Sequence, residues 1–118
     1  PERVSFYEQR IAARLPLPTC LFLVACVNAQ IVGALEASVY TRDGVFLPAS
    51  SLHIHGVFVA PEHRRQGVAV ALLEEAMGWG AQQGCDEVDL NVLSQNPAVE
   101  LYREVGFEVV SYKMTREL

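Results

Sequence analysis

The chain has 118 residues, 51% of them hydrophobic, which is the size and composition of one domain with a packed core and argues against disorder. The net charge of −5 argues against a nucleic-acid binder and mildly favours a cationic small substrate. The apolar run 21–27 is too short to span a bilayer, and no membrane partner is expected. The three cysteines have no CxxC spacing, so a reducing cytoplasm is expected rather than a zinc cluster or a disulfide framework.

In the first half of the chain, the pattern predicts one helix followed by three strands. Apolar residues close to helical spacing predict a short amphipathic helix within residues 1–15, which prolines end. The runs 21–27 and 31–40, separated by a short turn, predict a β-hairpin. A loop is expected over 41–51 and a third strand over 52–59.

In the second half, helices and strands alternate. A helix is predicted over 68–83, a strand over 87–93, a short helix over 98–105 and a last strand over 107–114. Asn96 is expected to be the N-cap of the short helix, with a proline at N1. The order of the elements predicts a mixed α/β sheet with an antiparallel beginning and a crossover in its second half.

The turn between the third strand and the helix that follows carries the clearest chemical signal. Pro61 ends the strand because it has no N–H for a continuing ladder, and Arg64-Arg65-Gln66-Gly67-Val68-Ala69 follows. A glycine at the start of a helix lets the backbone approach a ligand closely, and the free N–H groups of the first turn favour an anion. Two adjacent arginines strengthen the case for phosphate, although they also fit a solvated basic turn.

This turn and a second block downstream resemble the motifs of the GNAT superfamily of acyl-CoA-dependent N-acyltransferases. The first family motif, Arg/Gln-x-x-Gly-x-Gly/Ala, is matched by residues 64–69. The second, Asn-x-x-Ala-x-x-Leu-Tyr-x-x-x-Gly-Phe, is matched in part by Asn96-Pro97-Ala98, Leu101-Tyr102 and Gly106-Phe107. The resemblance covers roughly residues 19–118, and the two motifs in order are more specific than either alone.

The resemblance implies a GNAT-like three-layer fold, in which a mixed, mostly antiparallel sheet with a splayed central strand pair is flanked by helices. The family opens with a strand and two helices, whereas residues 1–16 have room for about one helix, so a shortened N-terminus is expected. Acetyl-CoA or another acyl-CoA is the implied donor. Its pyrophosphate would lie on the N–H groups from Arg65 to Ala69, its pantetheine would pair with the strand end, and an N–H near Phe58 would polarise the thioester. The implied cofactor-binding residues are Val57, Phe58, Val59, Arg64, Arg65, Gln66, Gly67, Val68, Ala69 and Asn96, the last of which capping alone would also explain.

Catalytic candidates follow from the resemblance and from the chemistry of amines. Tyr102 matches the family tyrosine that protonates the departing thiolate, although it could also fill the inner stripe of its helix. The amine must lose a proton before it attacks, because an alkylamine of pKa ~10.4 is mostly protonated at neutral pH. His53 and His55 alternate on one strand and so face the same side, and His53 falls where some family members place a glutamate base. Glu36, on a neighbouring strand, is a further candidate that also fits a solvent-facing carboxylate.

The function expected from these residues is transfer of an acetyl group from acetyl-CoA to a primary amine by direct attack in a ternary complex. The acceptor is a small molecule or a peptide amine, and a homodimer is common for the family. One alternative is a GNAT-like module that binds or senses CoA without turnover. Another is a metal site in which His53 and His55 are joined by Glu62 or His63, although no metal is expected in the favoured reading.

Overall fold

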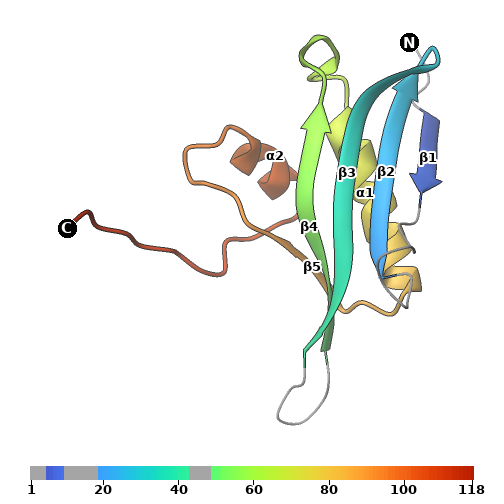
Figure 1. Ribbon diagram of the computed structural model, residues 1–118. Coiled ribbons are helices and arrows are strands. Elements are labelled where there is room, and N and C mark those ends of the chain that lie inside the picture. The colour runs from blue at the N-terminus through green and yellow to red at the C-terminus, as the bar shows by residue number, and fades with distance from the viewer. Residues whose placement is uncertain (1–4, 10–18, 43–48) are drawn as a thin grey trace.

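A five-stranded mixed sheet organises the computed structural model, which describes residues 5–9, 19–42 and 49–118 (Figure 1). In order across the sheet, the strands are β1 (Ser5–Gln9), β2 (Cys20–Val27), β3 (Gln30–Arg42), β4 (Ala49–Val59) and β5 (Glu87–Leu90). The helices are the 3₁₀ helix η1 (Pro61–His63), α1 (Val68–Gln82) and α2 (Ala98–Glu104). α1 lies against one face of the sheet and α2 lies beside β4 (Figure 1). The predicted mixed α/β fold is confirmed.

The first four strands are antiparallel neighbours, and the fifth joins them through a crossover. β2 and β3 form the predicted hairpin, in which Asn28 and Ala29 have positive φ values of 50° and 64°. Two consecutive residues of this kind form a type I′ turn, whose twist matches that of the flanking strands. After β4, α1 carries the chain back so that β5 runs parallel to β4, as the order of the elements predicted.

A β-bulge in β4 changes which of its residues face the core. The register against β3 shifts after Glu36, so that His55 is an extra residue in β4. Before the shift, Leu52 and Ile54 are buried under α1, whereas after it the odd-numbered residues from Val57 onward pack against the core. The strand therefore keeps apolar contact with the core along its whole length, although the alternation of its side chains changes phase halfway.

Small residues let α1 approach the sheet closely. A Cβ added to Gly33 of β3 would lie 3.0 Å from both the Phe58 carbonyl oxygen and the Val68 side chain. At the other end of the helix, a Cβ on Gly80 would lie 3.0 Å from the Leu52 side chain. The two glycines thus allow both ends of α1 to lie close to the sheet. The core between them is made of Leu21, Leu23, Ala25, Val27, Val32, Leu35, Ala37, Leu52, Ile54, Val68, Leu72, Leu73, Ala76 and Trp79.

The predicted N-terminal helix is wrong where the structure describes it. Residues 5–9 form β1, which pairs antiparallel with the edge of β2, while residues 1–4 and 10–15 lie outside the described residues. A short run with some helical spacing gains little by itself from helix formation, because nucleation is costly. The unpaired edge of β2 instead offers a row of N–H and C=O groups that a strand satisfies.

Two further predicted boundaries differ from the structure between the hairpin and α2. The predicted loop 41–51 is partly wrong, since β3 continues to Arg42 and β4 begins at Ala49, with residues 43–48 outside the described chain. The predicted strand 87–93 ends at Leu90, where its ladder with β4 also ends. A strand at the edge of a sheet extends only as far as its partner pairs with it.

The predicted last strand over 107–114 is not formed. The chain leaves α2 as an extended segment that carries no ladder and runs away from the sheet (Figure 1). The helices predicted over 68–83 and 98–105 are confirmed to within one residue at their ends. None of the helices in the described part of the chain combines the length and the apolar character that a membrane crossing requires.

Candidate functional site

The site is built where β4 and β5 diverge. The two strands pair only from Ser51 to Ile54 of β4, opposite Glu87 to Leu90 of β5. Beyond that point β4 continues to Val59 with its β5-side edge not covered by β5, so the expected splayed strand pair is confirmed. Phe58, on this stretch, is 59% exposed, a large apolar side chain standing beside an open strand edge. Such an edge can accept an extended ligand as an added strand.

Just beyond the end of β4, the turn 64–67, where the sequence predicts an anion site, has an unusual backbone conformation. Arg65 and Gly67 both adopt left-handed conformations, with φ values of 62° and 80°. A left-handed conformation is unusual for an arginine, and Arg64 before it is extended, with φ −69° and ψ 155°. No described side chain caps the first turn of α1, and the space in front of Gly67 is open. The N–H groups of the turn and the helix start can therefore receive a phosphate.

The two arginines of this turn have different surroundings. The Arg64 side chain turns back, and its Nε donates a hydrogen bond of 3.3 Å to the carbonyl oxygen of Val59. This hydrogen bond attaches the turn to the end of β4. The backbone of Arg65, in contrast, has the strained left-handed conformation. Next to them, the His63 ring contacts the Gln66 side chain at 3.3 Å. Both arginines are exposed, so their guanidinium groups can approach an anion in the turn.

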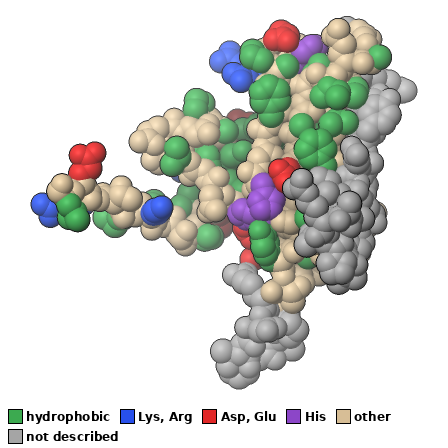
Figure 2. Space-filling model, viewed as in Figure 1, with side chains coloured by type: hydrophobic (Ala, Val, Ile, Leu, Met, Phe, Trp, Pro, Cys, Tyr) green, Lys and Arg blue, Asp and Glu red, His purple; other side chains and the backbone are tan. Residues whose placement is uncertain are grey.

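A second group of polar side chains lies on the open face of the sheet, the face opposite α1. His53 and His55 have ring centroids 4.9 Å apart, and the ring of Tyr40 stands edge-on to both, at 5.7 and 6.3 Å. Ser38 on β3 forms a hydrogen bond with Nε2 of His55. Figure 2 shows histidine and acidic side chains together in the middle of this face. The expectation that the two histidines face the same side is confirmed.

Asp89 on β5 completes this group and was missed by the sequence analysis. In the parallel register it lies directly opposite His53, and its carboxylate accepts hydrogen bonds from Nδ1 of His53 and from the hydroxyl of Ser51. With Nδ1 donating to a carboxylate, neutral His53 carries its acceptor lone pair on Nε2. The sequence shows Asp89 as a carboxylate at a polar position of the alternating strand 87–90. The alternation does not indicate which residue of another strand lies opposite it.

These side chains line an open cavity of about 320 Å³ on the surface of the sheet. Its lining residues are Tyr40, Thr41, Ser51, His53 and Asp89. The lining thus combines an aromatic ring, two hydroxyls, an imidazole and a carboxylate. In the described chain it contains neither lysine nor arginine, so the cavity suits a cationic ligand better than an anionic one.

Glu36 lies on the same open face but apart from the histidine–aspartate pair. It is exposed, as one of its two interpretations predicted, and pairs with Gly56 at the register shift. Its strand, β3, is an interior strand of the sheet and not an edge. No hydrogen bond or ion pair between Glu36 and a histidine is found among the described residues.

Tyr102 is half-buried on α2, where it packs against the core. Its ring stands edge-on to Phe107 at a centroid distance of 5.8 Å, and burial raises the pKa of the phenol above its usual value. The hydroxyl therefore stays protonated at neutral pH and can act as a proton donor. Within the described chain, no hydrogen bond joins it to His53 or His55, so the structure does not bring the three catalytic candidates into one contact group.

Asn96 lies one residue before the N-cap position of α2, which it was expected to occupy, although it still forms a hydrogen bond with the start of the helix. Its Oδ1 accepts a hydrogen bond of 2.9 Å from the N–H of Ala98, the first residue of the helix. Pro97, expected at N1, occupies the N-cap position instead, one residue earlier than predicted. The amide oxygen of Asn96 is thus used by the helix, and its NH₂ group remains as the donor that a ligand could use.

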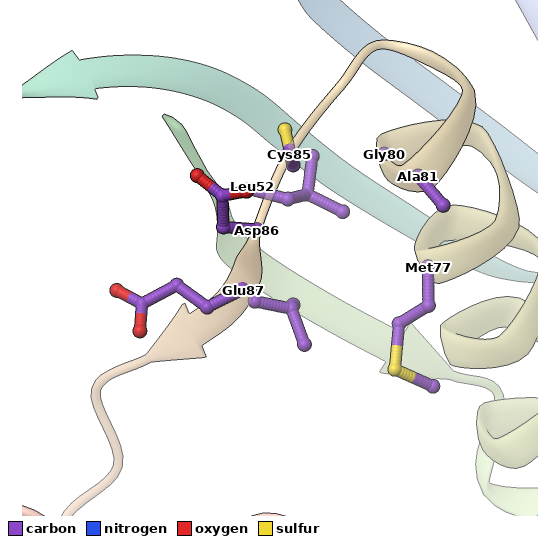
Figure 3. A pocket seen from close by; sticks show the side chains of 8 residues that line it. Leu52, Met77, Gly80, Ala81, Cys85, Asp86 and Glu87 are labelled. Atoms are coloured by element: carbon purple, nitrogen blue, oxygen red, sulfur yellow. The ribbon is translucent and has the colours of Figure 1, made fainter. Parts of the chain in front are cut away.

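The geometry supports neither Cys85 as a nucleophile nor the alternative metal site at the histidine pair. Cys85 lines a separate cavity of about 190 Å³ near the C-terminus of α1, together with Met77 and Glu87 (Figure 3). Burial and the neighbouring Asp86 raise the pKa of its thiol, which makes the nucleophilic thiolate scarcer at neutral pH. In the described part of the chain, no group of three or more His, Cys, Asp and Glu side chains could hold a metal ion, so Glu62 and His63 do not complete the histidine pair.

The fold is one that solved N-acetyltransferases share. The structure matches an aminoglycoside N-acetyltransferase in complex with CoA with a TM-score of 0.81 and 16% sequence identity, over 100% of this chain and 96% of that one. The family model described as "Acetyltransferase (GNAT) family" matches residues 1–107. The chain therefore belongs to the GNAT acetyltransferase family, as its motifs indicated.

Two curated relatives are named as N-acetyltransferases for different acceptors. The chain is 33% identical over 92 residues to aminoglycoside N(6')-acetyltransferase type 1 of Acinetobacter haemolyticus, covering 75% of this chain and 62% of that protein. It is 31% identical over 108 residues to the L-amino acid N-acetyltransferase of Escherichia coli, covering 87% of this chain and 60% of that protein. The chain thus spans about six tenths of the length of these relatives.

Proposed function

We propose that the protein transfers an acetyl group from acetyl-CoA to a primary amine by direct attack in a ternary complex. The observation that carries this proposal is the course of β4. One strand leads from the His53–Asp89 pair, past an uncovered edge, to the anion-binding turn at 64–67. From His53 to Val59 the strand extends roughly 20 Å, at about 3.3 Å per residue, so both ends of an extended thioester ligand can be bound at once.

In this proposal the cofactor is held mainly by backbone groups. The N–H groups of Arg65 to Ala69 bind the pyrophosphate, and Arg64 and Arg65 add charge at its edge. The uncovered edge of Val57 to Val59 pairs with the pantetheine chain, and a backbone N–H near Phe58 polarises the thioester carbonyl. Gln66 lies within the turn, and Val68, which is buried, contributes its N–H while its side chain anchors α1 in the core.

His53 is the general base that we favour over His55. Asp89 holds the imidazole through Nδ1, which leaves Nε2 to take a proton from the ammonium group of the acceptor before the neutral amine attacks. His55 has its Nε2 engaged with Ser38 and, with Tyr40, it shapes the wall of the acceptor site. After the amine nitrogen attacks the carbonyl carbon and the C–S bond breaks, Tyr102 donates its phenolic proton to the departing sulfur, and the second proton that the nitrogen loses on becoming an amide passes through water to restore the phenol. Its raised pKa keeps that proton in place at neutral pH.

The acceptor we propose is a small amine with more than one positive charge. The cavity beside His53 is lined by the Asp89 carboxylate and by no described lysine or arginine. An aminoglycoside, the substrate class named for one relative, fits this lining better than an L-amino acid, whose carboxylate would find no cationic partner there. The three cysteines, all free, fit a location in the reducing cytoplasm.

The test has two steps. Isothermal titration calorimetry measures acetyl-CoA binding, and release of free CoA thiol is then followed with a panel of an aminoglycoside, a polyamine and an L-amino acid. Binding followed by amine-dependent thiol release supports the proposal, with the aminoglycoside the best acceptor. Acetyl-CoA binding without turnover on any amine would favour a CoA-sensing module, and absence of binding would overturn the whole assignment.

A further inference from the structure

Gly56 lies in the interior of β4, and the fold gives no reason for a glycine at this position. A glycine weakens the interior of a strand, because it loses more backbone freedom on folding than other residues do. The glycines with positive φ are Gly67, Gly84 and Gly106, so the backbone of Gly56 is in a conformation open to other residues. Apart from its two chain neighbours, no described atom would lie within 4 Å of a Cβ added at Gly56.

The missing side chain leaves a gap on the open face of the sheet. Gly56 pairs with Glu36 of β3, and residues that pair in an antiparallel ladder point to the same face. Along β4, the side chains that border the gap on this face are those of His55 and Phe58, which are both large and exposed. The gap is therefore bounded along the strand by an imidazole ring on one side and a phenyl ring on the other.

The gap opens toward the uncovered edge of β4. The ladder between β4 and β5 ends at Ile54, two residues before Gly56, and no described strand pairs with that edge of β4 beyond this point. The cavity lined by His53 and Asp89 lies before the gap along β4, and the uncovered stretch Val57 to Val59 lies after it. Gly56 thus stands between the place proposed for the amine and the place proposed for the thioester.

This position bears on which amines can react. In the proposed reaction, the amine nitrogen has to pass from Nε2 of His53 to the thioester carbon, and the carbon that carries the nitrogen passes over Gly56 with it. That carbon is slender in an unbranched amine, whereas in a ring or branched amine it carries two further carbon substituents. Where a substrate fits a pocket closely, a difference of one methylene group changes specificity by about 10- to 200-fold.

We infer that Gly56 is a specificity-determining residue, whose missing side chain admits acceptors with the amine on a ring or branched carbon. A side chain at this position would occupy the space that the two substituents need, and would leave unbranched amines as the better acceptors. The inference rests on the proposed acetyl transfer for the placement of the two ligands. It adds to that proposal the kind of carbon skeleton that the acceptor site receives.

The test compares two amines that have the same number of carbons and charges. Hexamethylenediamine carries its amines on unbranched carbons, whereas cyclohexanediamine carries them on ring carbons. The affinity of each is measured by NMR chemical-shift titration of the protein saturated with CoA, which has no acetyl group to transfer. The variants are Gly56→Leu and the milder Gly56→Ala. The matched control is Gly78→Leu, because Gly78 also has open space around it but is exposed on α1.

In Gly56→Leu, the affinity for cyclohexanediamine should fall about 10-fold or more, and that for hexamethylenediamine much less. Gly56→Ala should show the same selectivity more weakly, with a urea midpoint as high as that of the unchanged protein or higher. The control should bind both diamines as the unchanged protein does.

The inference is overturned if the Gly56 variants weaken both diamines alike, if they weaken neither, or if neither diamine binds the unchanged protein. A selective loss of the ring diamine, together with no release of thiol from acetyl-CoA on any amine, would instead refute the proposed transfer and leave the role of Gly56 in amine binding intact. The two failures are therefore distinguishable.

Discussion

The most informative single change is Asp89→Asn, because it tests the contact between β4 and β5 that orients the proposed base. Asparagine keeps the size of the side chain but presents a weaker, uncharged acceptor to Nδ1 of His53 and to the hydroxyl of Ser51. A hydrogen bond to a charged group is worth about 1.5–3 kcal/mol. Since the side chains of His53 and Asp89 are 21% and 46% exposed, solvent screening lowers this to roughly 1–2 kcal/mol.

That energy converts to a rate, since each 1.36 kcal/mol corresponds to about a factor of ten. We therefore expect Asp89→Asn to lower kcat about 5- to 30-fold, whereas His53→Ala, which removes the proposed base itself, should lower it by about 10² to 10⁴. The affinity for acetyl-CoA should not change, because Asp89 lies on β5 opposite His53, whereas the turn at 64–67 follows the end of β4.

The assay measures thiol release at saturating acetyl-CoA and amine, with calorimetry on the same samples for cofactor affinity. Asp89→Glu, which keeps the carboxylate, should recover part of the lost kcat. Glu36→Gln is the matched control, since it neutralises an exposed carboxylate on the same face and should have little effect. The reasoning is refuted if Asp89→Asn turns over at the rate of the unchanged protein, or if Glu36→Gln proves the more damaging of the two.

Three other predictions follow from the turn, the tyrosine and the helix contact. Gly67→Ala should weaken acetyl-CoA binding several-fold by calorimetry, because alanine at φ 80° is strained by about 1 kcal/mol and the turn would relax away from its anion-binding shape. Tyr102→Phe should lower kcat by about 10²-fold with acetyl-CoA affinity unchanged. Since the folded pKa of Tyr102 is raised, its contribution to stability is complete below about pH 10 and is lost as pH rises further. The phenylalanine variant should therefore lose less stability above that pH in urea titrations. Gly33→Ala should destabilise the fold by about 1–3 kcal/mol, because its Cβ would lie 3.0 Å from a backbone carbonyl that cannot move aside; an unchanged urea midpoint would contradict this packing argument.

The parts of the site that depend on local sequence were predictable. The conformation at Arg65 and Gly67 depends on a few neighbouring residues, and the sequence places a turn before the helix where the structure has one. The hydrogen bond between Asn96 and Ala98 and the hairpin turn at residues 28–29 are local in the same sense. Such features need no knowledge of which strands become neighbours.

Asp89 and the two chain ends were not predictable in the same way. The partnership of Asp89 with His53 depends on a parallel register between strands that are more than thirty residues apart, which periodicity does not contain. Residues 5–9 pair with β2 although their own pattern suggested a helix, since a free strand edge outweighs a weak local preference. Residues 107–114 have the pattern of a strand, but they form no ladder, because a strand also requires a neighbouring strand to pair with.

The bulge at His55 gives the two halves of β4 different exposed surfaces, one for each of the two proposed ligands, the amine and the cofactor. In a regular strand, the parity that buries Leu52 and Ile54 would also turn Phe58 inward and leave Val57 and Val59 outside. The extra residue reverses the parity, so that Val57 and Val59 reach the core while Phe58 stays exposed beside the uncovered edge. The bulge also bends β4, and the ladder with β5 ends immediately before it, at Ile54. The same irregularity therefore keeps Phe58 on the open side and ends the ladder with β5, which opens the edge on which the proposed thioester ligand would lie.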